Sequence, residues 1–299
     1  MSGDPSSNLL KLVPLGIPTL IIADDPQLIA AACAAYAHWR AAAPDFEPQI
    51  ELRLAIGRAS TEKVSLAITV EGSCLWLSGE GVCGSADAAA RNASVTMSPE
   101  IAKDAAQFAE ICDTLLLFIL ARNGRTPVHA AAFLLCDLVV VLAGPSGSGK
   151  STLALAAASA GYRVLSDDTV FVQREPSFRL WGFPRAIHVY PADAPAGEHP
   201  IRNRNGKLKA ALRIGAPALS AERAALVLLE RGSELALSPA ARAEVIEALM
   251  HLDAGFDLLQ AASRAAFEAL ASGGTWRLTL TSDPAAAIDA LRDRFAATQ

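Results

Sequence analysis

The sequence contains no pair of cysteines at the short spacing of a metal-binding or redox motif. Its five cysteines lie far apart, at Cys33, Cys74, Cys83, Cys112 and Cys136. Scattered single cysteines are typical of reduced thiols in the core of a cytosolic protein, and not of a disulfide framework or a structural zinc site. We therefore expect a cytoplasmic protein.

Segments that would carry the chain into or across a membrane are also lacking. The opening residues, MSGDPSSNLLKLVPLG, have no basic stretch followed by an apolar core, so no secretory signal is expected. The longest apolar run, residues 130–143, is too short to span a bilayer and contains Asp137. With a net charge of −5, the chain also lacks a broad attraction for nucleic acid or an anionic membrane.

What is present in quantity is apolar sequence, with 52% hydrophobic and 19% charged residues, which favours a packed core over disorder. The 299 residues are enough for two domains, and we place a small α+β domain at 1–105 and a second domain at 106–299. Alternating apolar residues between Gly and Ser breaks predict an antiparallel sheet with one solvated face in the first domain. The strands predicted to form this sheet are at 50–57, 63–72 and 74–81, and they follow a short apolar strand at 18–24 and a helix at 25–43.

A predicted helix over about residues 100–123 leads into the second domain, from a Ser-Pro-Glu start to an Asn-Gly stop. Then follow a strand at 137–143, a glycine loop, a helix at 151–161 and a strand at 163–172. This order of strand, loop, helix and strand is the unit that builds a parallel sheet. Later elements are predicted at 225–232 (strand), 239–252 and 255–273 (helices), 275–282 (strand) and 283–297 (helix).

The glycine loop carries the clearest chemical signal. Residues 144–151, GPSGSGKS, match GxxxxGK[ST] at every fixed position, after an apolar strand and before a helix. The glycines let the loop amides point at phosphate oxygens, and the helix N-terminus adds partial positive charge. Lys150 can reach the β- and γ-phosphates and Ser151 can ligate Mg²⁺. We expect ATP and Mg²⁺ as cofactors, held by Gly144, Ser146, Gly147, Ser148, Gly149, Lys150, Ser151 and Thr152.

Two adjacent carboxylates follow the loop helix, at Asp167 and Asp168. Neighbouring residues of a strand point to opposite faces, so one carboxylate could face the phosphates while the other serves a metal ion or a backbone group. A carboxylate near the γ-phosphate can accept the proton of an attacking hydroxyl. Solvated acids at a turn are the alternative interpretation. His129, judged by residue type alone, is more often a satisfied histidine of a half-buried strand.

Residues 128–172, VHAAAFLLCDLVVVLAGPSGSGKSTLALAAASAGYRVLSDDTVFV, resemble the core of the HPr kinase/phosphorylase family. In that family a histidine precedes a short hairpin leading into the P-loop, and an Asp-Asp pair follows on the strand after the loop helix. The resemblance implies an α/β fold, with a P-loop kinase domain of the family's C-terminal type in residues 106–299. It also implies a homo-oligomer. It places His129 in the site, makes Asp168 the proton acceptor, and makes Asp167 an accessory or metal-proximal residue.

The chain departs from this family at three points. Ala130 follows the histidine where the family usually has glycine, and the N-terminal half does not match the usual N-terminal domain. The family's later glutamate signature, a magnesium contact, has no clear match in residues 179–195, with Asp193 or Glu198 as substitutes. The chain is more similar to divergent HPr-kinase-related proteins, which include kinases of a serine in lasso-peptide precursors. Candidates for holding phosphate or an acidic peptide end are Arg185, His188, Arg202, Arg204, Lys207 and Lys209.

Together these features predict a kinase that transfers the γ-phosphoryl of ATP to a serine or threonine hydroxyl of a protein or peptide. A small-molecule kinase of the shikimate or gluconate type is one alternative, although its loop usually lies near the chain start and here begins at residue 144. A nucleotide-binding regulatory module with little catalysis is another. An ordinary ATPase is disfavoured because no later apolar strand ends in an obvious Walker B acid.

Overall fold

The structure is a computed structural model that describes residues 8–40, 46–59, 66–191, 201–202, 208–213, 215, 217–251 and 263–296. The chain divides into two compact units, Met1–Asn123 and Gly124–Gln299. The sequence placed this boundary at residue 105, before helix α3 (Ala105–Arg122). That helix belongs to the first unit, because its apolar face packs against strands of the first sheet.

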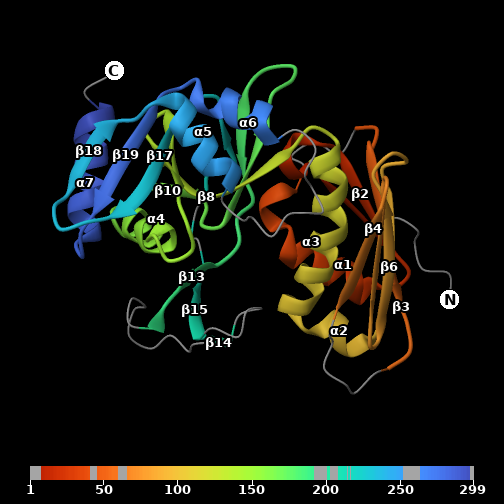
Figure 1. Ribbon diagram of the computed structural model, residues 1–299. Coiled ribbons are helices and arrows are strands. Elements are labelled where there is room, and N and C mark those ends of the chain that lie inside the picture. Colours follow the sequence, from red (N-terminus) through yellow and green to blue (C-terminus); the bar gives the residue numbers. More distant parts are fainter. Residues whose placement is uncertain are drawn as a thin grey trace. The chain divides into compact units, whose positions relative to one another are not determined.

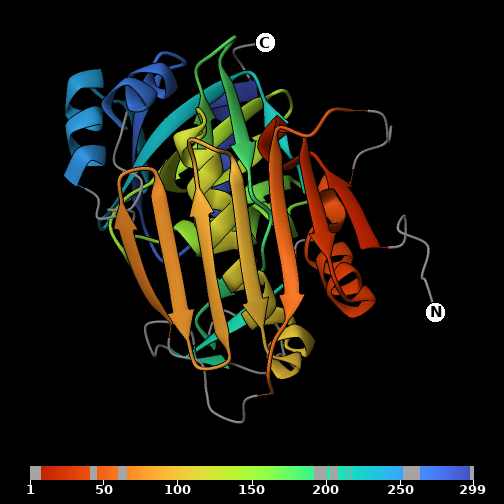
Figure 2. The same cartoon turned by 90° about the vertical axis from the view of Figure 1, so that its right-hand side faces the viewer.

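A seven-stranded mixed sheet in the order β1-β2-β3-β7-β6-β5-β4 forms the first unit. Helices α1, α2 and α3 cover one face of this sheet, and Figure 2 looks onto the other face. The elements are β1 (Leu9–Leu12), β2 (Thr19–Ala23), α1 (Pro26–Ala35), β3 (Ile50–Ile56), β4 (Ala67–Glu71), β5 (Cys74–Gly79), β6 (Val82–Asp87), β7 (Asn92–Met97), α2 (Pro99–Lys103) and α3.

The prediction of an antiparallel sheet is wrong for the first of its three strands, β3, which pairs parallel with both β2 and β7. Helix α1 carries the chain back along the sheet between β2 and β3, so these two strands run the same way. Strands β4 to β7 pair antiparallel as a meander. Alternation holds along the strands: Leu52 and Leu54 are buried on the helix side, whereas Arg53 is exposed.

The helix predicted over 100–123 is interrupted at Asp104. The backbone of Asp104 is extended, with φ −84° and ψ 102°, and its carboxylate accepts hydrogen bonds from the amides of Ala106 (3.0 Å) and Gln107 (3.1 Å). Asp104 therefore caps a new helix, and the preceding turn becomes the separate helix α2, which Ser98 caps.

The second unit is built on a larger mixed sheet with the path β16-β12-β11-β8-β9-β17-β19-β18, to which β10 is added beside β8. Strands β8, β10, β17, β18 and β19 of this sheet are labelled in Figure 1. Strands β9, β17 and β19 are parallel, while β8 runs antiparallel to β9. The strands are β8 (Thr126–Leu135), β9 (Leu138–Ala143), β10 (Arg163–Ser166), β11 (Thr169–Gln173), β12 (Arg179–Gly182), β16 (Ser220–Ala221), β17 (Ala224–Arg231), β18 (Ala236–Pro239) and β19 (Thr275–Leu280).

Helices cover both faces of the larger sheet. One face packs on α4 (Lys150–Ser159) and α7 (Pro284–Ala296), and the other on α5 (Arg242–His251) and α6 (Ser263–Ala271). A small three-stranded sheet, in the order β13-β15-β14, joins the α4 side through apolar residues of β13 and β15. Its strands are β13 (Ile187–Val189), β14 (Ile201–Arg202) and β15 (Leu208–Leu212).

The sheet order differs from the simple parallel unit predicted around the glycine loop. Strands β9 and β10 point the same way, but β8 lies between them and pairs antiparallel with both. The strand predicted over 163–172 is also broken, into β10 and β11, by a bend at Asp167 and Asp168. Both corrections concern pairing between distant segments, and both determine where the acidic residues lie.

Within the described residues, no helix is both long enough and apolar enough to cross a membrane.

Candidate active site

The glycine loop forms the turn between the end of β9 and the start of α4. Gly147 and Gly149 have φ of +85° and +110°, in the left-handed region that favours glycine. Lys150 and Ser151 are the first residues of α4, so the loop amides and the helix N-terminus are adjacent. Backbone amides and a helix N-terminus that lie together in this way can bind phosphate, as the motif predicts.

Contacts around Gly144 show how closely the loop is folded. A Cβ atom added there would lie 2.8 Å from Ser148 Oγ and 3.1 Å from the Leu229 carbonyl oxygen. Ser148 is 5% exposed, and its hydroxyl has no hydrogen-bond partner among the described residues. An unsatisfied buried hydroxyl in a glycine loop fits a loop that completes its hydrogen bonds with a bound anion.

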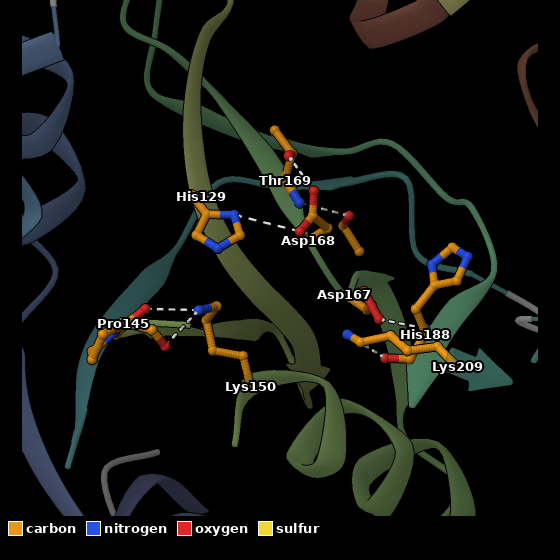
Figure 3. Close-up of polar contacts among 10 residues, drawn as sticks. His129, Pro145, Lys150, Asp167, Asp168, Thr169, His188 and Lys209 are labelled. Atoms are coloured by element: carbon orange, nitrogen blue, oxygen red, sulfur yellow. Dashed lines mark hydrogen bonds and ion pairs between the residues drawn. The ribbon is translucent and has the colours of Figure 1, made fainter. Parts of the chain in front are cut away.

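Lys150 is buried at the base of the loop. Its Nζ donates hydrogen bonds to the carbonyl oxygens of Gly144 (2.7 Å) and Pro145 (3.2 Å) (Figure 3). Burial lowers its pKa, the carboxylates of Asp168 and Asp167 act in the opposite direction, and the charge of Lys209 lowers it further. The ammonium group therefore donates its hydrogen bonds to neutral backbone oxygens, and an anionic phosphate would stabilise its positive charge more strongly.

Strand β8 brings the histidine and the acidic pair to this loop. In register, Ala130 lies opposite Ala143 of β9, and His129 lies opposite Thr169 of β11. His129 shares a face with Ala131 and Phe133, which pack on the α4 side of the sheet. His129 and the Asp167–Asp168 bend therefore lie near the C-terminal end of β9, where the glycine loop begins.

Asp168 is the solvent-facing carboxylate of the pair. Its side chain is 73% exposed, and its Oδ1 lies 3.4 Å from His129 Nδ1 (Figure 3). Its Oδ2 accepts a hydrogen bond of 3.2 Å from the Thr169 hydroxyl. The imidazole and the hydroxyl together orient a carboxylate that an incoming hydroxyl group can reach from solvent.

Asp167 points away from its neighbour and is 6% exposed. Its Oδ2 accepts a hydrogen bond of 2.8 Å from the backbone amide of His188 in β13. Burial raises the pKa of Asp167 to about 6, with the charge of Asp168 acting in the same direction, while the His188 amide, Lys209 and the Ser151 hydroxyl lower it. A buried carboxylate beside Ser151 is an environment that a cation would stabilise.

The donor set at this position fits Mg²⁺ held together with phosphate oxygens. Ser151 and Asp167 offer oxygen ligands only, and Mg²⁺ usually takes one or two protein oxygens and completes its shell with phosphates and water. The described part of the chain contains no group of three or more His, Cys, Asp and Glu side chains placed to hold a metal ion. Such an ion would therefore be bound together with the nucleotide.

The small sheet contributes two further candidates from the sequence. Lys209 of β15 donates a hydrogen bond of 3.2 Å to the carbonyl oxygen of His188, the residue whose amide holds Asp167. Burial lowers the pKa of His188, and the charge of Lys209 lowers it further. The guanidinium of Arg185 lies 4.6 Å from the Phe183 ring centroid and donates a hydrogen bond of 3.4 Å to the Pro184 carbonyl oxygen. The side chains of Asp193, Glu198, Arg202, Arg204 and Lys207 lie outside the described residues.

Sequence reasoning missed two residues at the end of β17, the parallel neighbour of β9. Arg231 lies over the loop, since a Cβ added to Gly149 would be 3.3 Å from its Nη2 atom. Glu230 occupies the end of the strand where a Walker B acid is sought, but its carboxylate accepts a hydrogen bond from Thr279 and pairs with Arg277. Both residues belong to the predicted strand ALVLLERG. Only the pairing of β17 with β9 places the end of this strand next to the end of β9, where the glycine loop begins.

No model of a known protein family matches the chain, and no curated protein matches it. Among solved structures, the HPr(Ser) kinase/phosphatase from Coxiella burnetii is similar over 58% of this chain and 97% of its own, at 11% sequence identity and a TM-score of 0.32. A likeness of this size is distant, so the functional proposal rests on the residues of the site itself.

Proposed function

We propose that this chain is an ATP- and Mg²⁺-dependent kinase that transfers a phosphoryl group to a serine or threonine hydroxyl of a protein or peptide. The observation that carries the proposal is the meeting of the glycine loop with the Asp167–Asp168 bend beside His129. The glycine loop alone would support only nucleotide binding. The exposed carboxylate of Asp168 next to the loop adds a proton acceptor, which phosphoryl transfer to a hydroxyl group also requires.

In the proposed reaction the hydroxyl oxygen of the acceptor attacks the γ-phosphorus of ATP. The new O–P bond forms while the bond from the γ-phosphorus to the β–γ bridging oxygen breaks, and ADP leaves with that electron pair. Asp168 accepts the hydroxyl proton, His129 holds the Asp168 carboxylate in position, and Lys150 neutralises charge on the phosphates. Ser151 and Asp167 would hold Mg²⁺, which supplies further neutralisation of phosphate charge when bound.

A protein or peptide acceptor is favoured over a small metabolite by the exposure of the proposed base. The side chain of Asp168 is 73% exposed, so a hydroxyl on a large molecule can reach it without being enclosed. A serine of a ribosomally made precursor peptide, such as a lasso-peptide precursor, is the first acceptor to test.

The test uses the purified chain with Mg²⁺ and γ-labelled ATP. It is offered serine-containing peptides, including any precursor encoded beside its gene, together with HPr and common hydroxyl metabolites, and the label is located by mass spectrometry. Label on a peptide or protein serine is the expected result, and label on a metabolite instead would replace this proposal with a small-molecule kinase. No transfer from ATP that the chain demonstrably binds, across the whole panel, would favour a regulatory module.

The matched variants are Lys150→Ala and Asp168→Asn. Lys150→Ala removes a phosphate contact and should weaken both nucleotide binding and transfer. Asp168→Asn keeps the shape of the side chain and should retain nucleotide affinity while transfer falls by at least about a hundredfold. Transfer by Asp168→Asn at close to the wild-type rate would remove Asp168 from the role of base.

A further inference from the structure

A second lysine reaches the phosphate site from a different part of the fold. Lys209 lies on β15, the central strand of the small sheet, far along the chain from the glycine loop. Its Nζ donates to the His188 carbonyl oxygen at 3.2 Å, and the His188 amide donates to Asp167 Oδ2 at 2.8 Å. One residue of β13 thereby fixes both the buried carboxylate and this ammonium group.

In Figure 3 the side chain of Lys209 extends from β15 to a position beside Asp167, and its amino group points toward the side of the site where Lys150 lies. The two lysines are close enough for the charge of Lys209 to lower the pKa of Lys150. Lys150 is buried and Lys209 is half-buried, and two like charges this close are stabilised by nearby anionic charge, which the carboxylates of Asp167 and Asp168 supply in part.

Among the described residues, both ammonium groups contact neutral groups, and Lys209 Nζ also lies 5.4 Å from the centroid of the Tyr190 ring. Within the described part of the chain, both ammonium groups donate to backbone carbonyl oxygens, and neither has a carboxylate at ion-pairing distance. Lys209 makes one such hydrogen bond and retains further N–H donors, since an ammonium carries three. The site therefore presents two cations with unused donors on either side of the position expected for transferred phosphate.

We propose that Lys209 binds the terminal phosphoryl group of the nucleoside triphosphate, opposite Lys150. This inference rests on the proposed function and deepens it, because it assigns the γ-phosphoryl contact to the small sheet. Lys150 approaches the phosphates from the loop helix and Lys209 from β15, so the terminal phosphoryl is held from two sides. A nucleoside diphosphate, which lacks that group, does not reach Lys209.

The test is a comparison of two nucleotides on Lys209→Met, which removes the charge and keeps most of the length of the side chain. Binding of ADP and of a non-hydrolysable ATP analogue is measured by titration calorimetry in the presence of Mg²⁺. We expect the analogue to bind at least about tenfold more weakly to Lys209→Met than to the wild-type chain. We expect ADP affinity to be unchanged, and Lys209→Arg to restore most of the analogue affinity.

Arg213→Met is the matched control, because Arg213 is an exposed cation just beyond the same strand, whereas Lys209 is the cation whose charge lowers the pKa of both Lys150 and Asp167. It should leave both affinities unchanged. Equal affinity of Lys209→Met and wild type for the analogue, with transfer by the wild type intact, would overturn this inference alone. An equal loss for both nucleotides would also overturn it, since that result indicates a structural role. A wild-type chain that binds neither nucleotide would overturn the proposed function as well.

Discussion

Replacing the buried carboxylate Asp167 by asparagine should make the nucleotide-free protein more stable at neutral pH. Asp167 is 6% exposed and has a pKa of about 6, above the value of 3.8 expected in the unfolded chain. Ionised Asp167 is therefore disfavoured in the folded state. Asparagine is nearly isosteric, is never charged, and its side-chain oxygen can still accept the hydrogen bond from the His188 amide.

The sign and the size of the expected difference in unfolding free energy between Asp167→Asn and wild type follow from proton linkage. Because the folded state binds the Asp167 proton more tightly, wild-type stability relative to Asp167→Asn falls as the pH rises from about 4 to about 6, and is level above that range. The pKa of Asp167 is about two units higher in the folded state than in the unfolded chain. This difference corresponds to about 3 kcal/mol of stability in favour of Asp167→Asn at pH 8, and to about half of that at pH 5.

The assay is urea unfolding at pH 5 and pH 8, with circular dichroism and tryptophan fluorescence as probes, and with the free-energy difference between variant and wild type taken at each pH. Asp168→Asn is the control. That residue is the exposed member of the pair, so its replacement should change stability by less than about 0.5 kcal/mol at both values. The reasoning is refuted if Asp167→Asn is no more stable than wild type at pH 8, or if its advantage does not grow between pH 5 and pH 8. Transfer activity should be lost in the same variant.

Two further outcomes are expected from the geometry of the site. Gly144→Ala should weaken ATP binding by at least about tenfold in titration calorimetry. The added Cβ would lie 2.8 Å from Ser148 Oγ and 3.1 Å from a main-chain oxygen and would force the loop open. Unchanged affinity would contradict this account of the loop. His129→Phe should lower kcat for transfer by at least about tenfold while leaving KM for ATP nearly unchanged, because the imidazole lies 3.4 Å from the Asp168 carboxylate. A rise in KM alone would indicate that His129 acts in nucleotide binding instead.

The glycine loop was predictable because all of its determinants are local. Residues 144–151 carry the pattern, and the apolar strand and the helix that flank it can be read from the same stretch of sequence. The positions of Gly147 and Gly149 in the left-handed region agree with the motif. Local sequence also predicted the later strand β17 and helix α7 close to their observed bounds.

The arrangement around the loop was less predictable because it depends on pairing between distant segments. The run 163–172 has a strand-like composition throughout, and nothing local marks the bend at Asp167. The bend directly follows an irregularity in the register between β10 and β8, between Val164 and Ser166, which only the paired strands reveal. Lys209 is harder still to place, since its approach to Asp167 depends on the pairing of β15 with β13.

Glu230 shows why the acidic residues of this site come from the β10–β11 bend and not from the strand beside the loop strand. Leu229 of β17 packs on the α4 side of the sheet, so alternation turns Glu230 toward the opposite face. There its carboxylate pairs with Arg277, which also pairs with Glu244 of α5, and it accepts a hydrogen bond from Thr279. Glu230 is thereby engaged in joining the sheet to α5 and does not face the phosphate loop. Strand β8, which lies between β9 and β10, brings the carboxylates of Asp167 and Asp168 near the loop instead. The same strand carries His129, so it separates the two strands that were predicted to be neighbours and also supplies a residue of the site.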